Sequence, residues 1–546
     1  MPLFLLLACT LISDAEIAGK LGESAGCSTP SAWFADADAD GFRDATRTRV
    51  HCAAGPGWVA DSTDCDDDHD ATSPAAGEVC GDFIDNDCDG TANACFPASA
   101  SLSEGLQFVG ESEGDHAGDA VAGAGDVNGD GFDDLIVGAY TAGQSGSGAV
   151  YLILGSGSPA SSSLRSVYAE YTGETPSSYA GGSVAAAGDV DGDGFDDMLV
   201  GASGAGREWE SIGAAYLVLG STWPGSGSLA EANAEYTGEA IGDYAGVAVS
   251  SAGDFDGDGL ADIVVGAFRN EESGTEAGAA YLVLGSASPA STSLRAADAK
   301  YTGEAPSDNA GFCVAAAGDA DGDGLDDLLV GAWYNDEGGG GAGAAYLLLG
   351  AKAPADASLA LADAKYTGEA VSDSAGRFVA SAGDVNGDGF DDILVGAQGN
   401  DDGGSNSGAA YLVLGSRSPA GESLTTADAQ YTGPSGAVAG SVASAGDVDG
   451  DGFDDIVVGA SGDDDAGTDA GAAYLVRGSI TPFSASLSAA DAQFTGETAG
   501  DNAGDSVSAA GDVDSDGFAD LLVGAYNHDD GGTNAGAAYL IFGSGL

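Results

Sequence analysis

The sequence predicts an all-β fold, a seven-bladed β-propeller preceded by a small N-terminal module. A segment of the form Asp-x-Asp/Asn-x-Asp-Gly-x-x-Asp, followed by a short apolar run, occurs seven times at separations of 63, 65, 65, 65, 63 and 65 residues. These segments, which we call loops 1 to 7, begin at Asp126, Asp189, Asp254, Asp319, Asp384, Asp447 and Asp512. Each unit of about 64 residues also contains four strand-like pieces, the content of one propeller blade.

The four pieces of a unit are well separated in the second repeat, where they cover residues 183–188, 198–202, 214–220 and 235–239. The first piece is rich in Ala and Gly, which suits the crowded innermost strand of a propeller. The third piece carries a tyrosine in every unit, and we expect these tyrosines to fill the space between blades. They are Tyr151, Tyr216, Tyr281, Tyr346, Tyr411, Tyr474 and Tyr539.

Each loop has oxygen-bearing side chains at positions 1, 3, 5 and 9 and glycine at position 6. Alternating carboxylates around a sharp turn, with the carbonyl of position 7, are the ligands that Ca²⁺ prefers. Position 8 is Ala261 and Ala519 in two loops, whereas position 9 is always Asp, so position 9 is the predicted ligand. Position 12 is Val in every loop, where an EF-hand requires Glu, so the loops are not EF-hands.

The alternative is a solvated acidic turn, but neighbouring charges repel by about 4 kcal/mol per pair at an effective dielectric constant near 20. Seven copies of one spacing favour ion binding. The predicted ligands, with position 7 acting through its carbonyl, are Asp126, Asn128, Asp130, Phe132 and Asp134; Asp189, Asp191, Asp193, Phe195 and Asp197; Asp254, Asp256, Asp258, Leu260 and Asp262; Asp319, Asp321, Asp323, Leu325 and Asp327; Asp384, Asn386, Asp388, Phe390 and Asp392; Asp447, Asp449, Asp451, Phe453 and Asp455; and Asp512, Asp514, Asp516, Phe518 and Asp520.

The composition excludes several partners. The 546 residues include 88 acidic and 14 basic side chains, which gives a formal charge of -74. Nucleic acids and anionic membranes require clustered Lys and Arg and are therefore not expected partners. Seven divalent ions would add 14 charges and leave -60, so much of the acidity belongs to the surface. No stretch approaches the roughly 18 apolar residues of a membrane span.

The N-terminus is apolar up to Cys9, and its Leu-Leu-Ala-Cys sequence resembles the lipobox of bacterial lipoproteins, although no Lys or Arg precedes the apolar run. The resemblance implies that residues 1–24 are a lipoprotein-type signal and linker, with a possible lipid anchor at Cys9. We therefore expect an exported protein, either on the cell surface, as an outer-membrane lipoprotein, or secreted.

Residues 25–97 form the predicted N-terminal module, which contains Cys27, Cys52, Cys65, Cys80, Cys88 and Cys95. Six cysteines allow up to three disulfides in 15 connectivities, and zinc is the less favoured alternative because no Cys-x-x-Cys pair occurs. The spacing of the propeller loops returns once more in this module and predicts a further calcium site, with Asp36, Asp38, Asp40, the carbonyl of Phe42, and Asp44.

Residues 64–70 and 78–90 resemble the Asp- and Cys-rich metal-binding motif of bacterial surface proteins, with Gly81-Asp82-Phe83 in place of Asp-Gly-x. The resemblance implies a module stabilised by ions and disulfides, because the segment is too small to bury a large core. A plain acidic spacer is the alternative.

The repeated loop, its apolar run and the following Gly-Ala resemble the FG-GAP repeat of integrin α-subunit propellers, over residues 103–546. The resemblance implies calcium in the hairpin between the first two strands of a blade, and partners held on the opposite face. Two features depart from the family. Its Phe-Gly is mostly Ala-Gly here, as at Ala245-Gly246, and all seven loops are complete.

The seventh unit has no fourth strand after residues 537–543, whereas residues 107–111 match the fourth-strand segment 170–174 and have no blade ahead of them. We therefore expect residues 107–111 to pair with the seventh blade and close the ring.

The predicted function is a non-enzymatic binding or adhesion protein with an extracellular protein or glycan ligand. The loops after the second strand, including Trp209 and Trp333, are candidate contacts. One alternative is an extracellular hydrolase or lyase, but its candidate acids recur at one blade position, which favours a structural role; another is a purely structural envelope protein. The recurring acids are Glu174, Glu239, Glu304, Glu369 and Glu497. The four histidines form no evident triad, and Cys313 is expected to be a free thiol.

Overall fold

The computed structural model describes residues 31–35, 48–51, 58–59, 99–206 and 211–543. The chain divides into two compact units, Met1–Cys95 with Ser544–Leu546, and Phe96–Gly543. The predicted lipid anchor at Cys9, the six cysteines of the N-terminal module, its acidic motif, the ion loop at residues 36–44 and the candidate contact Trp209 all lie outside the described residues.

Three short strands are described in the first unit, β1 (Ser31–Ala35), β2 (Thr48–His51) and β3 (Trp58–Val59). They form one antiparallel sheet in the order β2-β1-β3, with Ser31 opposite His51. In sequence, the predicted ion loop of this unit falls between β1 and β2.

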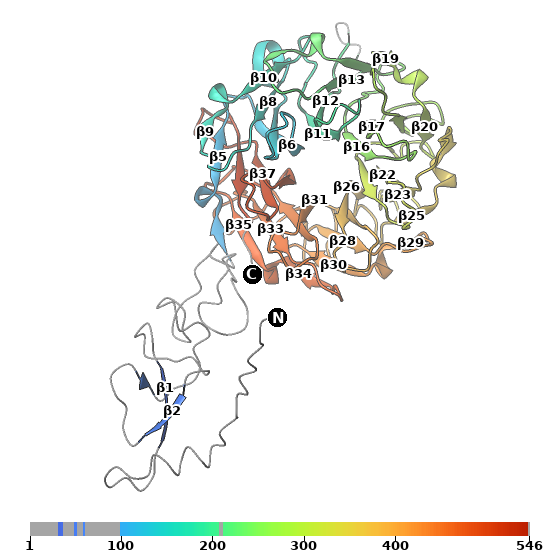
Figure 1. The fold of residues 1–546 in the computed structure, drawn as a ribbon. Coiled ribbons are helices and arrows are strands. Elements are labelled where there is room, and N and C mark those ends of the chain that lie inside the picture. The colour runs from blue at the N-terminus through green and yellow to red at the C-terminus, as the bar shows by residue number, and fades with distance from the viewer. Residues whose placement is uncertain (1–30, 36–47, 52–57, 60–98, 207–210, 544–546) are drawn as a thin grey trace, which may run out of the picture. The chain divides into compact units, whose positions relative to one another are not determined.

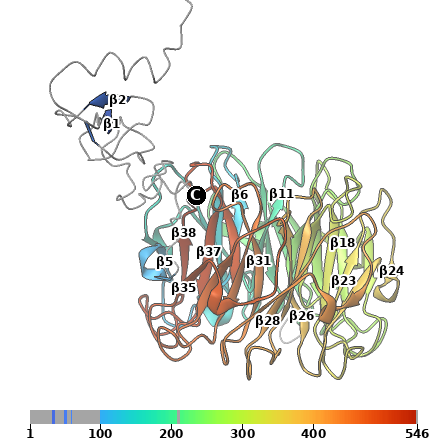
Figure 2. The same ribbon diagram turned by 90° about the horizontal axis from the view of Figure 1, so that it is seen from below.

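The second unit is a seven-bladed β-propeller made of seven five-stranded sheets arranged in a ring (Figure 1). This confirms the predicted all-β, seven-bladed fold. In the described ranges, the helical elements are short 3₁₀ turns and one five-residue π turn, η2 (Ala142–Gly146). No helix among the described residues is long and apolar enough to cross a membrane. Viewed edge on, the strands of each blade run between the two rims of the ring (Figure 2).

The three inner strands of each blade are antiparallel and consecutive in sequence. The innermost strands are β6 (Ala117–Gly125), β11 (Ser183–Gly188), β16 (Val249–Gly253), β21 (Val314–Gly318), β26 (Ala375–Gly383), β31 (Ala439–Gly446) and β36 (Val507–Gly511). The second strands are β7 (Asp134–Ala139), β12 (Asp197–Ala202), β17 (Asp262–Ala267), β22 (Asp327–Ala332), β27 (Asp392–Ala397), β32 (Asp455–Ala460) and β37 (Asp520–Ala525). The third strands are β8 (Ala149–Ile153), β13 (Ala214–Val218), β18 (Ala279–Val283), β23 (Ala344–Leu348), β28 (Ala409–Val413), β33 (Ala472–Val476) and β38 (Ala537–Ile541).

Each sheet has a fifth, two-residue strand that the sequence analysis missed. It comes from the next blade and pairs in parallel with the fourth strand. The fourth strands are β10 (Ala169–Thr172), β15 (Ala234–Thr237), β20 (Ala299–Thr302), β25 (Ala364–Thr367), β30 (Ala429–Thr432), β35 (Ala492–Thr495) and β5 (Leu106–Val109). The fifth strands are β14 (Gly227–Ser228), β19 (Thr292–Ser293), β24 (Ala357–Ser358), β29 (Glu422–Ser423), β34 (Ala485–Ser486), β4 (Ala100–Ser101) and β9 (Ser162–Ser163).

A 3₁₀ turn follows each fifth strand, and in every turn a serine caps the first residues while a leucine is buried beneath it. The turns are η1 (Leu102–Glu104), η3 (Leu164–Ser166), η4 (Leu229–Glu231), η5 (Leu294–Ala296), η6 (Leu359–Leu361), η7 (Leu424–Thr426) and η8 (Leu487–Ala489).

The ring closes through the segment that precedes the first blade. Strand β5 pairs with β38 in antiparallel register, with Phe108 opposite Ala538 and Gln107 opposite Tyr539. The closing strand therefore covers Leu106–Val109, which overlaps residues 107–111. Upstream, β4 adds the fifth strand to the sheet of β35. Residues 100–109 thus contain a short fifth strand, a 3₁₀ turn and a fourth strand. In the other blades these three elements follow the third strand.

The hydrophobic core lies between the blades. Seven clusters of buried residues each draw on two consecutive blades, and the cluster at the seam joins Phe108 and Leu540 to Val137 and Tyr151. The seven third-strand tyrosines are at most 2% exposed, as expected for core residues. Because every blade packs only against its two neighbours, the ring must be complete for each of them to be covered on both sides.

A glycine in each second strand allows neighbouring blades to approach this closely. A Cβ atom on Gly331 would lie 2.0 Å from the carbonyl oxygen of Gly376 in the next blade, and the equivalent glycines meet the same obstacle. The recurrent Gly-Ala and Ala-Gly pairs are therefore explained by backbone contact between blades.

Candidate metal centres

Loops 1 to 7 lie on one rim of the propeller, between the innermost and second strands of each blade. The glycine at position 6 has a φ between 87° and 97° in all seven loops, a conformation that glycine adopts without strain. The aspartate at position 9 is the first residue of the second strand, so the strand itself holds this carboxylate.

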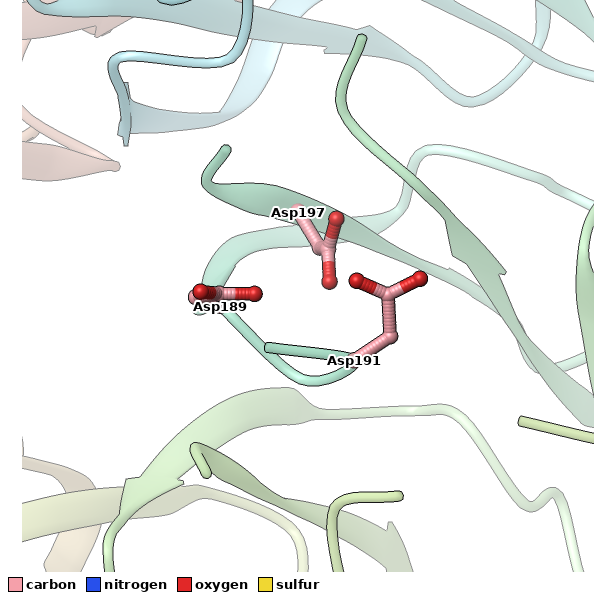
Figure 3. Close-up of side chains that lie close together, drawn as sticks. All are labelled: Asp189, Asp191 and Asp197. Carbon is pink, nitrogen blue, oxygen red and sulfur yellow. The ribbon is translucent and has the colours of Figure 1, made fainter. Parts of the chain in front are cut away.

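Loop 2 shows how the backbone organises the acidic side chains. The carboxylate of Asp189 accepts N–H groups of Gly192, Asp193 and Gly194 at 2.7 to 3.0 Å, which closes the turn. Asp197 accepts the N–H of Val190 at 3.0 Å and that of Gly220 at 2.8 Å. Figure 3 shows that Asp189, Asp191 and Asp197 point toward one another from the loop and from the start of β12.

Three carboxylates at positions 1, 3 and 9 converge in five of the loops, with one oxygen of each within 4.8 Å of the others. These groups are Asp189, Asp191 and Asp197; Asp254, Asp256 and Asp262; Asp319, Asp321 and Asp327; Asp447, Asp449 and Asp455; and Asp512, Asp514 and Asp520. Loops 1 and 5 have Asn128 and Asn386 at position 3, so an amide oxygen replaces one carboxylate.

The predicted ligands at positions 5 and 7 lie outside the groups formed by the side chains at positions 1, 3 and 9. The position 5 carboxylates are not part of the converging groups, and Asp193, for example, accepts the N–H of Phe195 at 3.1 Å. The side chain at position 7 packs on the preceding blade: a Cβ at Gly129 would lie 2.6 Å from the ring of Phe195. Only the carbonyl of position 7 is therefore available as a ligand, as the sequence analysis assumed.

Burial and mutual repulsion both oppose ionisation of the position 9 aspartates. Burial is the main cause that raises the pKa of Asp134, Asp197, Asp262, Asp327, Asp392 and Asp520 to about 7 and that of Asp455 to about 8. Nearby loop aspartates raise these pKa values further, whereas the backbone hydrogen bonds lower them. In loop 3, one carboxylate oxygen of Asp254 is buried without a hydrogen-bond donor. A bound cation would satisfy both the charge and this oxygen, so the residues present fit a metal ion.

Position 8, which the sequence analysis treated as a bystander, links neighbouring blades. The carboxylate of Asp196 in loop 2 accepts the N–H of Asp126 in loop 1 at 2.9 Å, while its own N–H donates to the Asp126 carbonyl at 3.3 Å. The seam has the same bond, between Asp133 and the N–H of Asp512 at 2.8 Å. Where position 8 is Ala261 or Ala519, only the backbone bond remains. The sequence of a single loop does not reveal this bond, because the carboxylate at position 8 and the N–H group that it accepts belong to consecutive blades.

Loop 6 differs from the other loops in having a basic partner. Arg477 donates to Asp449, the position 3 residue, at 3.2 Å and also to Asp491 at 3.2 Å. The other blades carry Leu154, Leu219, Leu284, Leu349, Leu414 and Phe542 at this place in the repeat. Loop 6 therefore has the positively charged side chain of Arg477 next to its converging carboxylates.

The recurring glutamates surround the third-strand tyrosines. Glu174 accepts the hydroxyl of Tyr216 at 3.0 Å, and Glu304 accepts the amide of Asn335 at 2.8 Å. Asn335 also donates to the hydroxyl of Tyr346. Asn335 and His528, which belong to the candidate contact loops, are each 2% exposed and take part in these networks instead of facing solvent.

Cys313 is a free thiol, as predicted, and bonds across blades. Its sulfur accepts the N–H of Val379 at 3.4 Å, just as the hydroxyl of Ser183 accepts the N–H of Val249 at 3.0 Å. Burial raises the pKa of the Cys313 thiol to about 11.

The fold and its rim of acidic loops define a β-propeller in which every repeat has one acidic loop. Residues 126–200 match the family of FG-GAP-like repeats, and residues 245–283, 375–413, 439–476 and 503–541 match the FG-GAP repeat. The matched segments include loops 1, 2, 3, 5, 6 and 7. The propeller is thus built of FG-GAP repeats and is integrin-α-like, as the resemblance implied.

Relatives support this description. The chain is 36% identical to integrin alpha pat-2 of Caenorhabditis briggsae over 144 residues, which cover 24% of this chain and 11% of that protein. It is 38% identical to integrin alpha pat-2 of Caenorhabditis elegans over 114 residues, or 21% and 9% of the two chains. Integrin alpha-4 of Xenopus laevis is 32% identical over 173 residues, or 30% and 15%. The alignments thus span at most about a sixth of these relatives.

Proposed function

We propose that this chain is an exported, calcium-binding propeller that acts as a cell-surface binding or adhesion protein. One observation carries the proposal: carboxylate oxygens from positions 1, 3 and 9 converge within 4.8 Å in five loops. Holding such groups together without a counter-ion is unfavourable, because burial and mutual repulsion both oppose their ionisation. A hard divalent cation with oxygen ligands removes this cost.

The residues that would hold the ion are the side chains at positions 1, 3, 5 and 9 and the carbonyl at position 7 of each loop. The amide oxygens of Asn128 and Asn386 would serve in loops 1 and 5. Calcium, when bound, supplies the positive charge that the loops lack. Because position 8 ties consecutive loops together, an ion in one loop would also steady the next blade.

The binding role rests on the fold and on the similarity to proteins named integrin alpha. Export with a lipid anchor at Cys9, disulfides and metal sites in the N-terminal module, and a protein or glycan ligand complete the proposal from the sequence. A non-enzymatic role is favoured because the recurring glutamates are committed to the tyrosine networks.

Calcium titration of the chelator-treated protein tests the metal part of this proposal. If the dissociation constants are roughly 0.1 to 1 mM, a tenfold excess of Ca²⁺ should stabilise the propeller by about 1.4 kcal/mol per site, or about 10 kcal/mol in total. We expect a large rise of the melting temperature with Ca²⁺, reversed by EGTA, and a smaller rise with Mg²⁺. A melting curve that is the same with Ca²⁺ and with EGTA would remove the metal assignment.

A matched pair of variants locates the ions. Asp191→Ala removes a predicted ligand of loop 2 and should lower the number of bound Ca²⁺ by one in calorimetry. Asp196→Ala removes only the bond between blades and copies the natural Ala261, so the number should stay unchanged. Equal stoichiometry in the two variants would contradict the assignment of position 3.

A further inference from the structure

The rim opposite the metal loops is where the repeats differ from one another. The innermost strand ends at its metal loop and the second strand begins there, so the start of the first and the end of the second lie on the other rim. The residue after the Ala-Gly pair at the start differs among blades: Asp119, Gly182, Val247, Phe312, Arg377, Ser441 and Asp505. So does the residue after the second strand: Tyr140, Ser203, Phe268, Trp333, Gln398, Ser461 and Tyr526.

Aromatic side chains of blades 3 and 4 form a continuous row on this rim. The ring centroids of Tyr244 and Phe268 are 5.7 Å apart, those of Phe268 and Phe312 5.5 Å, and those of Phe312 and Trp333 5.4 Å. Tyr334 extends the row, 3.9 Å from Trp333, and is 46% exposed. The distances between Tyr244, Phe268, Phe312 and Trp333 are typical of favourable aromatic contacts.

Arg377 of blade 5 lies at the end of this row. Its guanidinium carbon is 4.9 Å from the ring centroid of Trp333, 5.2 Å from that of Phe312 and 5.8 Å from that of Phe378. Among the described residues, no carboxylate forms an ion pair with Arg377, and Asp505 acts on it only through its longer-range charge. The Nε of Arg377 and the indole Nε1 of Trp333 are both enclosed and have no hydrogen-bond acceptor.

An arginine without an ion-pair partner is unexpected in a chain with 88 acidic residues. Arg269 shows the usual outcome in the same surroundings. Its guanidinium lies 5.2 Å from the rings of both Tyr244 and Phe268, but it also pairs with Glu276 at 3.5 Å. Arg377 therefore has a stacked guanidinium with no ion-pair partner among the described residues, which favours a negatively charged acceptor from another molecule.

A single carboxylate fits this site better than a phosphate group. One guanidinium balances one negative charge, and a doubly charged group would meet the repulsive field of a chain with a formal charge of -74. The apolar surroundings restrict the chemical class of the ligand further. Val371, which is 68% exposed, and Tyr334 both border the turn at residues 339–341 beside the site. Exposed aromatic and aliphatic groups around an arginine are the composition of the centre of a protein interface.

We propose that the patch formed by Phe312, Trp333, Tyr334, Val371 and Arg377 docks an acidic side chain of a partner protein, an Asp or Glu carboxylate flanked by apolar residues. The carboxylate pairs with the guanidinium of Arg377 beside Trp333, and the flanking residues cover Tyr334 and Val371. This inference names the partner chemistry for the binding role proposed above and rests on it.

The test uses the full chain in Ca²⁺ and the peptide acetyl-Ala-Tyr-Asp-Leu-Ala-amide, with the Asn peptide as its neutral counterpart. The chain has five tryptophans, so the Trp333 indole N–H signal is identified by its absence in Trp333→Phe. We expect the Asp peptide to shift this signal saturably and the Asn peptide to bind about tenfold more weakly, the usual effect of losing a charged hydrogen bond.

Substitution of the arginines provides the matched comparison. Arg377→Gln should weaken binding of the Asp peptide about tenfold or more, and Arg377→Lys, which keeps the charge but loses the planar fork, should fall between Gln and the wild type. Arg269→Gln, which removes an equally stacked but already paired guanidinium, should change affinity less than about twofold. Melting curves of all variants exclude a loss of folding.

Three results would overturn the proposal: an Arg377→Gln affinity equal to that of the wild type, equal binding of the Asp and Asn peptides, or tighter Arg377-dependent binding of glutarate or a galacturonate oligomer than of the peptide. Calcium stoichiometry is measured on the same samples. A protein that binds its calcium ions but not the peptide would contradict this inference alone.

Discussion

The two rims of the propeller are formed by opposite ends of the same strands, yet their sequences differ in kind. On the metal-loop rim, positions 1, 5, 6 and 9 are identical in all seven repeats, and each loop is bonded to the next. On the other rim, two positions vary among the repeats. The residue after the Ala-Gly pair is Asp, Gly, Val, Phe, Arg or Ser, and the residue after the second strand is Tyr, Ser, Phe, Trp or Gln. A position that makes the same contact in all seven blades has the same residue in every repeat. A position that makes no such contact can differ between blades and can therefore serve in recognition.

Removing the closing segment should have the largest effect on the repeated architecture. A chain that begins at Ser112 lacks β4 and β5 and takes Leu102 and Phe108, both almost fully buried, out of the core. Loss of two such side chains costs about 5 kcal/mol or more. We expect hydrogen exchange in residues 507–541 to lose most of its protection.

The control for this experiment is a chain that begins at Ala98, which keeps both strands. Its exchange in residues 507–541 should match that of the full chain. Equal protection in the two truncated chains would show that the seam does not depend on the N-terminal strands.

A pair of glycine variants in blade 4 tests whether repeated positions carry the packing. Gly331→Ala places a Cβ 2.0 Å from the Gly376 carbonyl and forces two blades apart, which should cost about 1 to 3 kcal/mol in denaturant unfolding. Gly340→Ala, at a position not shared by the repeats, meets no atom within 4 Å and should change stability by less than about 0.5 kcal/mol. Similar losses in both variants would contradict the proposed division of roles.

The repeated features could be predicted from the sequence because each of them occurs in all seven repeats. Blade number, the loop positions and the buried tyrosines all followed from periodicity. The features that it missed depend on one blade meeting another: the fifth strand, the bond made by Asp196 and the stacking of Arg377 on Trp333. A single repeat contains no information about which residue of its neighbour it faces, so these contacts required the assembled ring.

Loop 6 offers a smaller test, because it breaks the uniformity of the metal rim. Arg477 already neutralises part of the charge on Asp449 and must release it before an ion gains that ligand. Arg477→Leu, which copies the residue of five other blades, should raise the Ca²⁺ affinity of loop 6 by about tenfold, or about 1.4 kcal/mol. Calorimetry should show one site tightening.

Arg417→Leu is the control for Arg477→Leu, because it changes the net charge equally at an exposed arginine. It should leave the Ca²⁺ affinities unchanged. The same tightening in both variants would assign the effect to overall charge and not to Asp449.

The smallest predicted effect concerns His528, which stands in blade 7 where blades 3, 4 and 5 have Asn270, Asn335 and Asn400. Its Nδ1 lies 3.2 Å from Asp501, and its Nε2 lies 2.9 Å from the Gln107 amide of the closing strand and 3.5 Å from Asp530. Burial alone would lower the pKa of His528, but the hydrogen bond and charge of Asp501, with Glu497 and Asp530, outweigh it and raise the pKa.

A histidine whose pKa is raised by folding contributes stability that is fully present below its unfolded pKa of about 6.5 and is lost as the pH rises through the folded value. The paired carboxylate of Asp501 has a lowered pKa, because its bond to His528 and its other hydrogen bonds outweigh burial, so its contribution is lost only in acid. We therefore expect the contribution of His528 to the free energy of unfolding to be lost as the pH rises above 6.5, so that the decrease is smaller in His528→Asn than in the wild type. His116→Asn, at a histidine whose Nδ1 has no partner among the described residues, should leave the decrease in place. If the decrease is equally large in His528→Asn and in the wild type, this ion pair does not hold the seam of the ring, and blade 7 resembles blades 3, 4 and 5, which have asparagine at this position.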